Sequence, residues 1–154
     1  MKYCLLIFPA TFLLMACNKS GDSNPPVPAS SFTWTHAGVT YTASLDSAYE
    51  QSIALAPYYI IAINGTHFIT NYTRKIDFSL TSFNPGAYTI VQGGPNRLSY
   101  INDGGFNFDG IAGTINITSN ANNLLSGNFS ATLIDPGPAN SPLSGSFSNV
   151  SIRP

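Results

Sequence analysis

The chain has 154 residues and a formal net charge of −1, and only 8% of its residues are Asp, Glu, Lys or Arg. An average soluble domain carries about 25% charged residues, so we expect a neutral, polar surface, and the absence of a basic patch argues against nucleic acid as a partner. The two cysteines, Cys4 and Cys17, lie within or at the end of the apolar N-terminal segment. The rest of the chain contains no cysteine, which excludes a disulfide scaffold, a thiolate metal site and a cysteine nucleophile there.

Residues 1–16 have the pattern of a secretory signal peptide. Lys2 precedes a short apolar block that ends at the small residue Ala16. A membrane-spanning helix needs about 20 apolar residues, and this block is shorter and is interrupted by Pro9. We therefore expect export of the chain rather than a spanning segment.

The four residues Leu14-Met15-Ala16-Cys17 resemble the bacterial lipobox. The resemblance implies cleavage before Cys17, diacylation of its sulfur and acylation of the new N-terminus. Two or three acyl chains give stable attachment, because each buried CH₂ contributes about 0.8 kcal/mol. Asn18, rather than Asp, follows the cysteine, which by analogy implies the outer membrane and leaves open whether the domain faces the periplasm or the cell surface. The alternative is a plain secretory peptide in which Cys17 is incidental.

Residues 17–31 comprise this cysteine and a spacer rich in Pro, Ser and Asn. Pro25, Pro26 and Pro28 deny the segment helical and ladder hydrogen bonds and favour an extended conformation. The spacer therefore predicts a tether between the membrane and a single domain, residues 32–154.

Within this domain the hydrophobic residues repeat with a period of two, which predicts β-strands. Phe32–Trp34 and Val39–Tyr41 flank Ala37-Gly38 and predict a tight hairpin. Tyr58–Ile63 is continuously apolar, as expected for a crowded or doubly covered strand. Further strands are predicted at the following positions: Ile76–Leu80, Tyr88–Ile90, Leu98–Tyr100, Phe106–Phe108, Ile111–Ile117, Leu125–Ile134 and Ser144–Ile152.

The only helical candidate, Ser47–Ala56, lacks convincing caps. Nine or ten short strands without helices to form parallel crossovers predict an all-β antiparallel fold. We favour a β-sandwich, with a small antiparallel β-barrel as the alternative.

Ser126–Ser130 and Ser144–Ser148 share the form Ser-Gly-x-Phe-Ser, which predicts a hairpin whose two arms begin alike. Together with the lipobox, the proline spacer and the opening Phe32-Thr33-Trp34, these segments resemble the small, uncharacterised all-β lipoproteins abundant in Bacteroidota. The resemblance implies an exported and anchored β domain, and it supplies no catalytic residues.

Catalytic signals are weak. The histidines, His36 and His67, have neither a nucleophile elbow nor a zinc-binding spacing around them, and we expect both in exposed loops. A glycosidase would need two facing carboxylates, and the domain offers these acidic residues: Asp46, Glu50, Asp77, Asp103, Asp109 and Asp135.

The segment Asn102–Gly110 contains the best candidate metal ligands, Asp103, Asn107 and Asp109, since Ca²⁺ prefers closely spaced oxygen ligands. The same residues are also typical of a glycine-containing turn that leads into a strand. We therefore expect the protein to bind no metal and no cofactor.

Exposed aromatic side chains are the remaining signal, because Tyr and Trp stack on sugar rings and supply interface area. The candidates for glycan contact are Trp34 and the adjacent pair Tyr58 and Tyr59, which must point to opposite faces of a strand. Asp46-Ser47-Ala48 also resembles the O-glycosylation acceptor site of Bacteroidota, which would place a glycan on Ser47.

These observations predict a lipid-anchored protein of the bacterial cell envelope with a binding or assembly module that is not an enzyme. Its expected partners are the membrane, through the lipid, and a glycan or another envelope protein. The alternative function is a hydrolase that acts on envelope or dietary polysaccharide.

Overall fold

The computed structural model describes residues 26, 28–51, 58–64, 74–134 and 140–154, and these contain strands and no helix. No membrane-crossing helix is therefore present in these segments. The strands in chain order are β1 (Ser31–His36), β2 (Val39–Thr42), β3 (Leu45–Glu50), β4 (Tyr58–Asn64), β5 (Arg74–Leu80), β6 (Gly86–Val91), β7 (Arg97–Ile101), β8 (Asn107–Ala121), β9 (Leu124–Leu133) and β10 (Ser141–Arg153).

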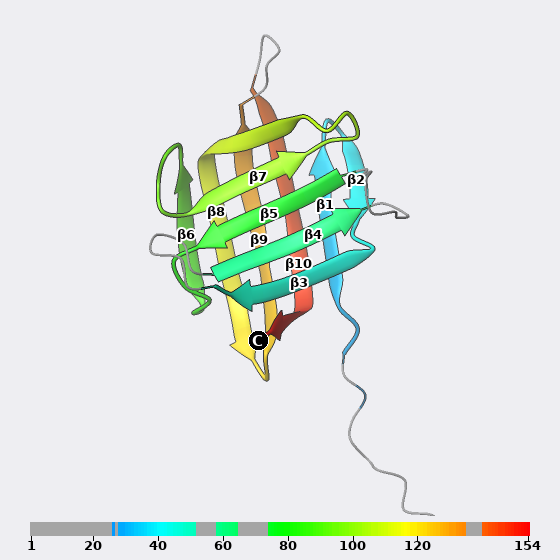
Figure 1. The fold of residues 1–154 in the computed structure, drawn as a ribbon, viewed down its shortest axis with the longest axis vertical. Coiled ribbons are helices and arrows are strands. Elements are labelled where there is room, and N and C mark those ends of the chain that lie inside the picture. The colour runs from blue at the N-terminus through cyan, green and yellow to red at the C-terminus, as the bar shows by residue number, and fades with distance from the viewer. Residues whose placement is uncertain (1–25, 27, 52–57, 65–73, 135–139) are drawn as a thin grey trace, which may run out of the picture.

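Seven of the strands close into a ring, in the order β3-β4-β5-β7-β8-β9-β10 and back to β3. The ring is flattened into two layers (Figure 1). We call β3, β4, β5 and β7 the front layer; its strands cross those of the back layer, which contains β9 and most of β8 and β10. The prediction of an all-β fold is confirmed. The closed ring of strands corresponds to the small β-barrel that was predicted as the alternative to a β-sandwich.

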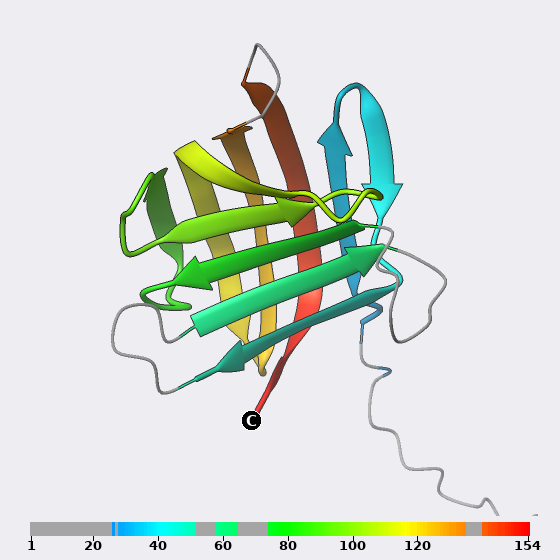
Figure 2. The ribbon, with the colours of Figure 1, turned by 45° about the horizontal axis from the view of Figure 1, so that its top comes forward.

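The remaining strands extend the back layer on both sides. β1 pairs with β10, β2 pairs with β1, and β6 pairs with β8. Figure 2 shows the β1–β2 hairpin beside the ring. Its turn residues, Ala37 and Gly38, have φ angles of 50° and 77°, as a two-residue hairpin turn requires. The predicted first hairpin is thus confirmed.

One pairing departs from the predicted antiparallel order. β10 and β3 run parallel at Ile152↔Ala48 and Arg153↔Tyr49. Strand directions that alternate around a ring cannot close on an odd number of strands, so a seven-stranded ring needs at least one parallel neighbour. This constraint is a property of the closed ring and not of any segment.

Two long strands make the corners between the layers. β8 pairs with β7 through Asn107–Asp109 and then with β9, with a register shift between Gly110 and Ala112. β10 pairs with β9 and reaches β3 only after a shift between Phe147 and Val150. A bulge bends its strand and increases the local twist, which lets one strand serve both layers. Two strands expected from the sequence, around Phe108 and from Ile111 onward, are therefore one continuous strand.

The helical candidate Ser47–Ala56 is corrected by the structure. Its first residues, through Glu50, belong to β3, and residues 52–57 lie outside the described part of the chain. Ala48 is fully buried and pairs with Ile60 of β4, so sheet pairing and core packing override a weak helical pattern.

Aromatic rings fill the interior between the layers. Phe32, 0% exposed, lies 5.5–6.0 Å, centroid to centroid, from the rings of four residues: Trp34, Phe78, Phe129 and Phe147. Phe78 comes from the front layer and the other rings from the back layer. A small barrel packed in this way is a core and not a ligand channel.

Candidate functional site

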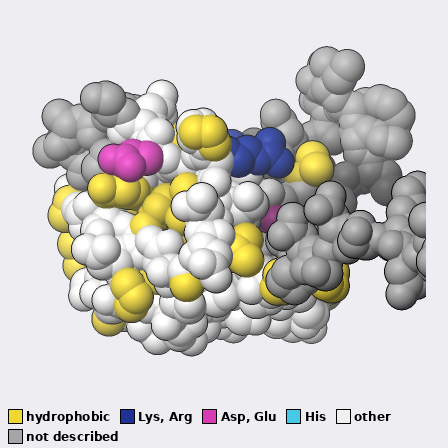
Figure 3. Space-filling view, turned by 90° about the horizontal axis from the view of Figure 1, so that it is seen from below, with side chains coloured by type: hydrophobic (Ala, Val, Ile, Leu, Met, Phe, Trp, Pro, Cys, Tyr) yellow, Lys and Arg dark blue, Asp and Glu magenta, His cyan; other side chains and the backbone are white. Residues whose placement is uncertain are grey.

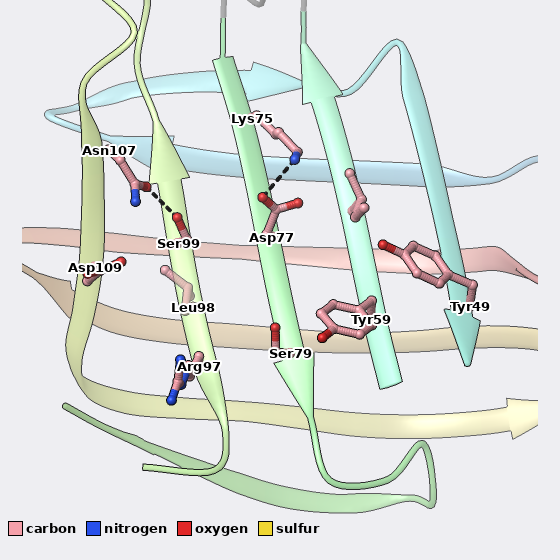
Figure 4. A pocket seen from close by; sticks show the side chains of 11 residues that line it. Tyr49, Tyr59, Lys75, Asp77, Ser79, Arg97, Leu98, Ser99, Asn107 and Asp109 are labelled. Carbon is pink, nitrogen blue, oxygen red and sulfur yellow. Dashed lines mark hydrogen bonds and ion pairs between the residues drawn. The ribbon is translucent and has the colours of Figure 1, made fainter. Parts of the chain in front are cut away.

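The outer face of the front layer carries a hollow of about 350 Å³, which we call the central groove (Figure 4). In β5, Ile76, Phe78 and Leu80 point into the core and are 0% exposed. Because successive side chains of a strand point to opposite faces, the intervening residues Lys75 and Asp77 point outward. The predicted alternation of β5 is thus confirmed, and its polar face forms the middle of the groove.

The register of the front layer aligns four outward residues into a row that we call the tyrosine row. Tyr49 of β3 pairs with Tyr59 of β4, Tyr59 pairs with Ser79 of β5, and Ser79 pairs with Arg97 of β7. The two tyrosine rings stack at a centroid distance of 5.3 Å and an interplanar angle of 17°. The neighbour of Tyr59 on its other side is the small Ser79, so space remains between the rings and Arg97 (Figure 4).

A second row of outward residues, the aspartate row, runs beside the first. Ile61 of β4 pairs with Asp77, Asp77 pairs with Ser99 of β7, and Ser99 pairs with Asp109 of β8. Ser99 Oγ donates a hydrogen bond to Oδ1 of Asn107, the next outward residue of β8. Serine residues thus line the groove, and larger polar side chains surround them.

Asp77 is a partly buried acidic group in the middle of the groove. Lys75 Nζ lies 2.9 Å from Asp77 Oδ2, whereas Asp77 Oδ1 is buried and has no hydrogen-bond partner among the described residues. Burial raises the pKa of the Asp77 carboxyl, and the hydrogen bond and charge of Lys75 oppose this shift only in part. The folded protein therefore holds this carboxylate at a cost in free energy.

Replacing Asp77 by asparagine is expected to stabilise the fold at neutral pH. Since the pKa is raised in the folded state, the penalty for the charged form is present above that pKa and disappears as the pH falls below the unfolded value of about 3.9. The melting temperature of Asp77→Asn should therefore exceed that of the wild type at pH 7, and the difference should shrink on acidification, as followed by circular dichroism. A variant less stable than the wild type at pH 7 would show that the Lys75 ion pair outweighs burial.

The aromatic residues expected to contact a glycan have three different positions. Trp34 is 1% exposed and belongs to the core, which corrects its assignment to a glycan-binding surface. Tyr58 is half-buried, with its ring 4.9 Å from that of Phe83. Tyr59 points outward into the groove. The prediction that Tyr58 and Tyr59 point to opposite faces is confirmed by this arrangement.

The calcium candidates are not brought together as a set. Asp103 lies in the turn before β8 and forms an ion pair with Arg74, whereas Asn107 and Asp109 line the groove. Asn102 Oδ1 accepts hydrogen bonds from the backbone N–H groups of Gly104 and Phe106, so the segment is built as a turn. Among the described residues, no group of three His, Cys, Asp or Glu side chains is placed to hold a metal.

The remaining candidate residues are Ser47, His36, Cys17 and His67. Ser47 is half-buried in the middle of β3, where its modification stays a prediction. His36 ends β1 and is half-buried, with Nε2 3.1 Å from Ser141 Oγ and its ring 4.7 Å from that of Tyr100, which corrects the exposed loop position expected for it. Cys17 and His67 lie outside the described residues.

Several groove residues are not candidates from the sequence alone, among them Tyr49 and Arg97. Tyr49 falls in the helical candidate Ser47–Ala56, and Asp77 is a candidate only as one of the six acidic residues of the domain. The alternation of β5 shows that Asp77 points outward, but not that Tyr59 and Arg97 lie on either side of its neighbour Ser79. That arrangement depends on the register of strands that are distant in sequence.

The surface is largely uncharged, as the composition predicts. Seen from below, it is mostly neutral polar and backbone atoms, with separate small hydrophobic areas and few charged side chains (Figure 3). The central groove is lined by four charged residues, Lys75, Asp77, Arg97 and Asp109, and is thus richer in charge than the chain as a whole.

Comparison of the chain with protein-family models, with curated proteins and with solved structures found no match in any of the three. The function of this protein must therefore be inferred from the geometry and chemistry of the central groove.

Proposed function

We propose that this protein is a lipid-anchored component of the bacterial cell envelope whose β domain binds carbohydrate at the central groove without catalysing a reaction. The observation that carries the proposal is the stacked pair Tyr49 and Tyr59, with polar side chains on the adjoining strands. Aromatic rings offer apolar faces to the C–H faces of sugars, and polar side chains exchange hydrogen bonds with the hydroxyl groups.

The position of the groove supports binding from outside the barrel. The interior is occupied by the rings around Phe32, so a ligand has no room there without unfolding the core. The central groove is open to solvent along the outer face of the front layer, where a domain anchored to the membrane through its N-terminal spacer presents it to large ligands.

The alternative function, polysaccharide hydrolysis, draws on two carboxylates that share the groove. Asp77 and Asp109 are separated in the sheet by Ser99, and a raised pKa suits a general acid. However, Lys75 engages Oδ2 of Asp77, and Oδ1 is buried. Neither oxygen is free to protonate a glycosidic oxygen in this arrangement, so the non-catalytic function is the better supported.

Binding should depend on the ring of Tyr59. On a glycan array probed with the purified full-length chain, Tyr59→Ala is expected to weaken binding to the best ligand by about tenfold or more, or about 1.4 kcal/mol. Tyr59→Phe keeps the ring and should stay within about threefold of the wild type, or about 0.7 kcal/mol. Equal affinities of Tyr59→Ala and wild type, or no glycan bound by the wild type, would reject the proposal.

Membrane attachment should depend on Cys17. In cells fed a radiolabelled fatty acid, Cys17→Ala is expected to abolish labelling of the chain, because the acceptor sulfur is removed. Cys4→Ala provides the matched control, since Cys4 belongs to the segment that is cleaved away, and its labelling should equal that of the wild type. Equal labelling of Cys17→Ala and wild type would rule out the anchor.

A further inference from the structure

The central groove continues at both ends into smaller hollows. On the side of β3, a hollow of about 140 Å³ shares Ile61 with the central groove and reaches Arg153 at the end of β10. On the side of β8, a hollow of about 270 Å³ shares Arg97 and Asp109 with it and reaches the turn at Gln92. The three hollows together form one line across the strands of the front layer.

The length of this line exceeds one sugar ring. From β3 to β8 it crosses four strand spacings of about 4.8 Å each, or about 19 Å. A single pyranose ring covers little more than one such spacing. Both ends reach residues that are exposed, Arg153 and Gln92, so the line fits a chain that extends beyond the site in both directions.

The charges along this line are balanced. The central groove contains Lys75 with Asp77 and Arg97 with Asp109, and the second of these pairs also borders the β8 hollow. The β3 hollow is bordered by Asp46 and Arg153. A charged polymer of either sign would meet a group of like charge in every hollow, whereas neutral hydroxyl groups both donate and accept hydrogen bonds and are repelled by neither kind of charge.

From this geometry we infer that the three hollows form subsites for a neutral, linear polysaccharide, bound along its interior across the strands of the front layer. The inference rests on the proposed function and specifies its ligand class. The aromatic pair Tyr49 and Tyr59 is positioned to hold a ring near the β3 end, and Arg97 bridges the central groove and the β8 hollow.

A chain-length series tests the inference. The full-length chain is first screened on an array of neutral and acidic polysaccharides, and oligosaccharides of one to six residues from the best ligand are then titrated by calorimetry. The affinity is expected to rise with each added residue up to about four, because about 19 Å is available. The monosaccharide should bind at least tenfold more weakly than the tetrasaccharide, and acidic chains of equal length at least tenfold more weakly than neutral ones.

A pair of serine variants locates the binding. Ser79→Tyr fills the space beside Tyr59 and should reduce tetrasaccharide affinity at least tenfold. Ser130→Tyr places the same ring at an exposed position on the outer face of β9, in the back layer, and should retain wild-type affinity. Circular dichroism melting of both variants verifies that each is folded.

The possible failures can be distinguished. A monosaccharide that binds as tightly as the tetrasaccharide, or a preference for acidic chains, overturns the inference and leaves carbohydrate binding intact. Retained binding by folded Ser79→Tyr overturns the location. Absence of binding to every polysaccharide on the array rejects both the inference and the proposed function.

Discussion

Replacing Phe32 by alanine is expected to lower the free energy of unfolding by about 3–5 kcal/mol, the range for removing a buried phenylalanine ring. Phe32 is 0% exposed, and its ring contacts aromatic rings from both layers, including Phe78 at 5.8 Å and Phe147 at 5.5 Å. Side chains on opposite layers cannot both move into the space that is left, because each is fixed by its own strand. Typical domains are stable by about 5–15 kcal/mol, so the loss is a large fraction of the total.

Urea denaturation of the wild type and of Phe32→Ala measures this loss. Phe106→Ala is the matched control, because Phe106 is 63% exposed in the turn before β8, and its removal should change stability by less than about 0.5 kcal/mol. A loss for Phe32→Ala no greater than that of Phe106→Ala would contradict the assignment of Phe32 to the centre of the core.

The second large effect is expected at the glycines of the repeated Ser-Gly-x-Phe-Ser segments. In the β9–β10 pairing, Gly145 lies opposite Phe129, and Gly127 lies opposite Phe147. The ring of each segment thus covers the glycine of the other. The prediction of a hairpin with similar arms is confirmed. In each arm the glycine leaves room for the phenylalanine ring of the other arm, which is the physical reason for the repetition.

Gly145→Ala should destabilise the protein by about 2–3 kcal/mol, through overpacking. A Cβ atom at this position would lie 2.2 Å from the carbonyl oxygen of Thr33 and 2.6 Å from Cζ of Phe129. The oxygen belongs to the β1–β10 ladder, so it cannot retreat without disturbing strand pairing. Gly127→Ala should behave similarly, because its Cβ would lie 2.4 Å from the carbonyl oxygen of Asn116.

Thermal melting of Gly145→Ala beside Gly104→Ala separates close packing from a general cost of removing glycine. At Gly104 the nearest atoms to an added Cβ belong to the exposed ring of Phe106, which can rotate away, so the change should be small. Equal melting temperatures for the two variants would show that the backbone around Gly145 adapts to the added methyl group.

Local patterns were sufficient to predict much of the fold. The alternation of Ile76, Phe78 and Leu80 depends only on the pleat of a strand, and the turn at Ala37-Gly38 depends only on its two residues, so both predictions are confirmed. In β1 the same alternation places Trp34 on one face with Phe32, between Thr33 and Thr35. Whether that face is buried depends on the strands that pack against it, so the burial of Trp34 could not be decided locally.

The site was less predictable than the fold because its residues meet only through register. Tyr59 is a candidate from its own sequence context, but Tyr49, Ser79 and Arg97 come from three other strands and align with it through successive pairings. A shift of one residue in any of these pairings would send that strand's outward side chains into the core. The groove is therefore a property of the assembled front layer.

Taken by itself, the sequence determined the strand-rich class, the first hairpin and the likeness to a lipidated N-terminus, because each depends on residues that are neighbours in the chain. Only the tertiary structure decided that the strands close into a ring of seven, that β8 and β10 bend to serve both layers, and that Tyr49 and Tyr59 lie on one side of Ser79 and Arg97 on the other. The physical reason is that ring closure and register are set by pairings between segments far apart in sequence. Those pairings are selected by how the whole core packs.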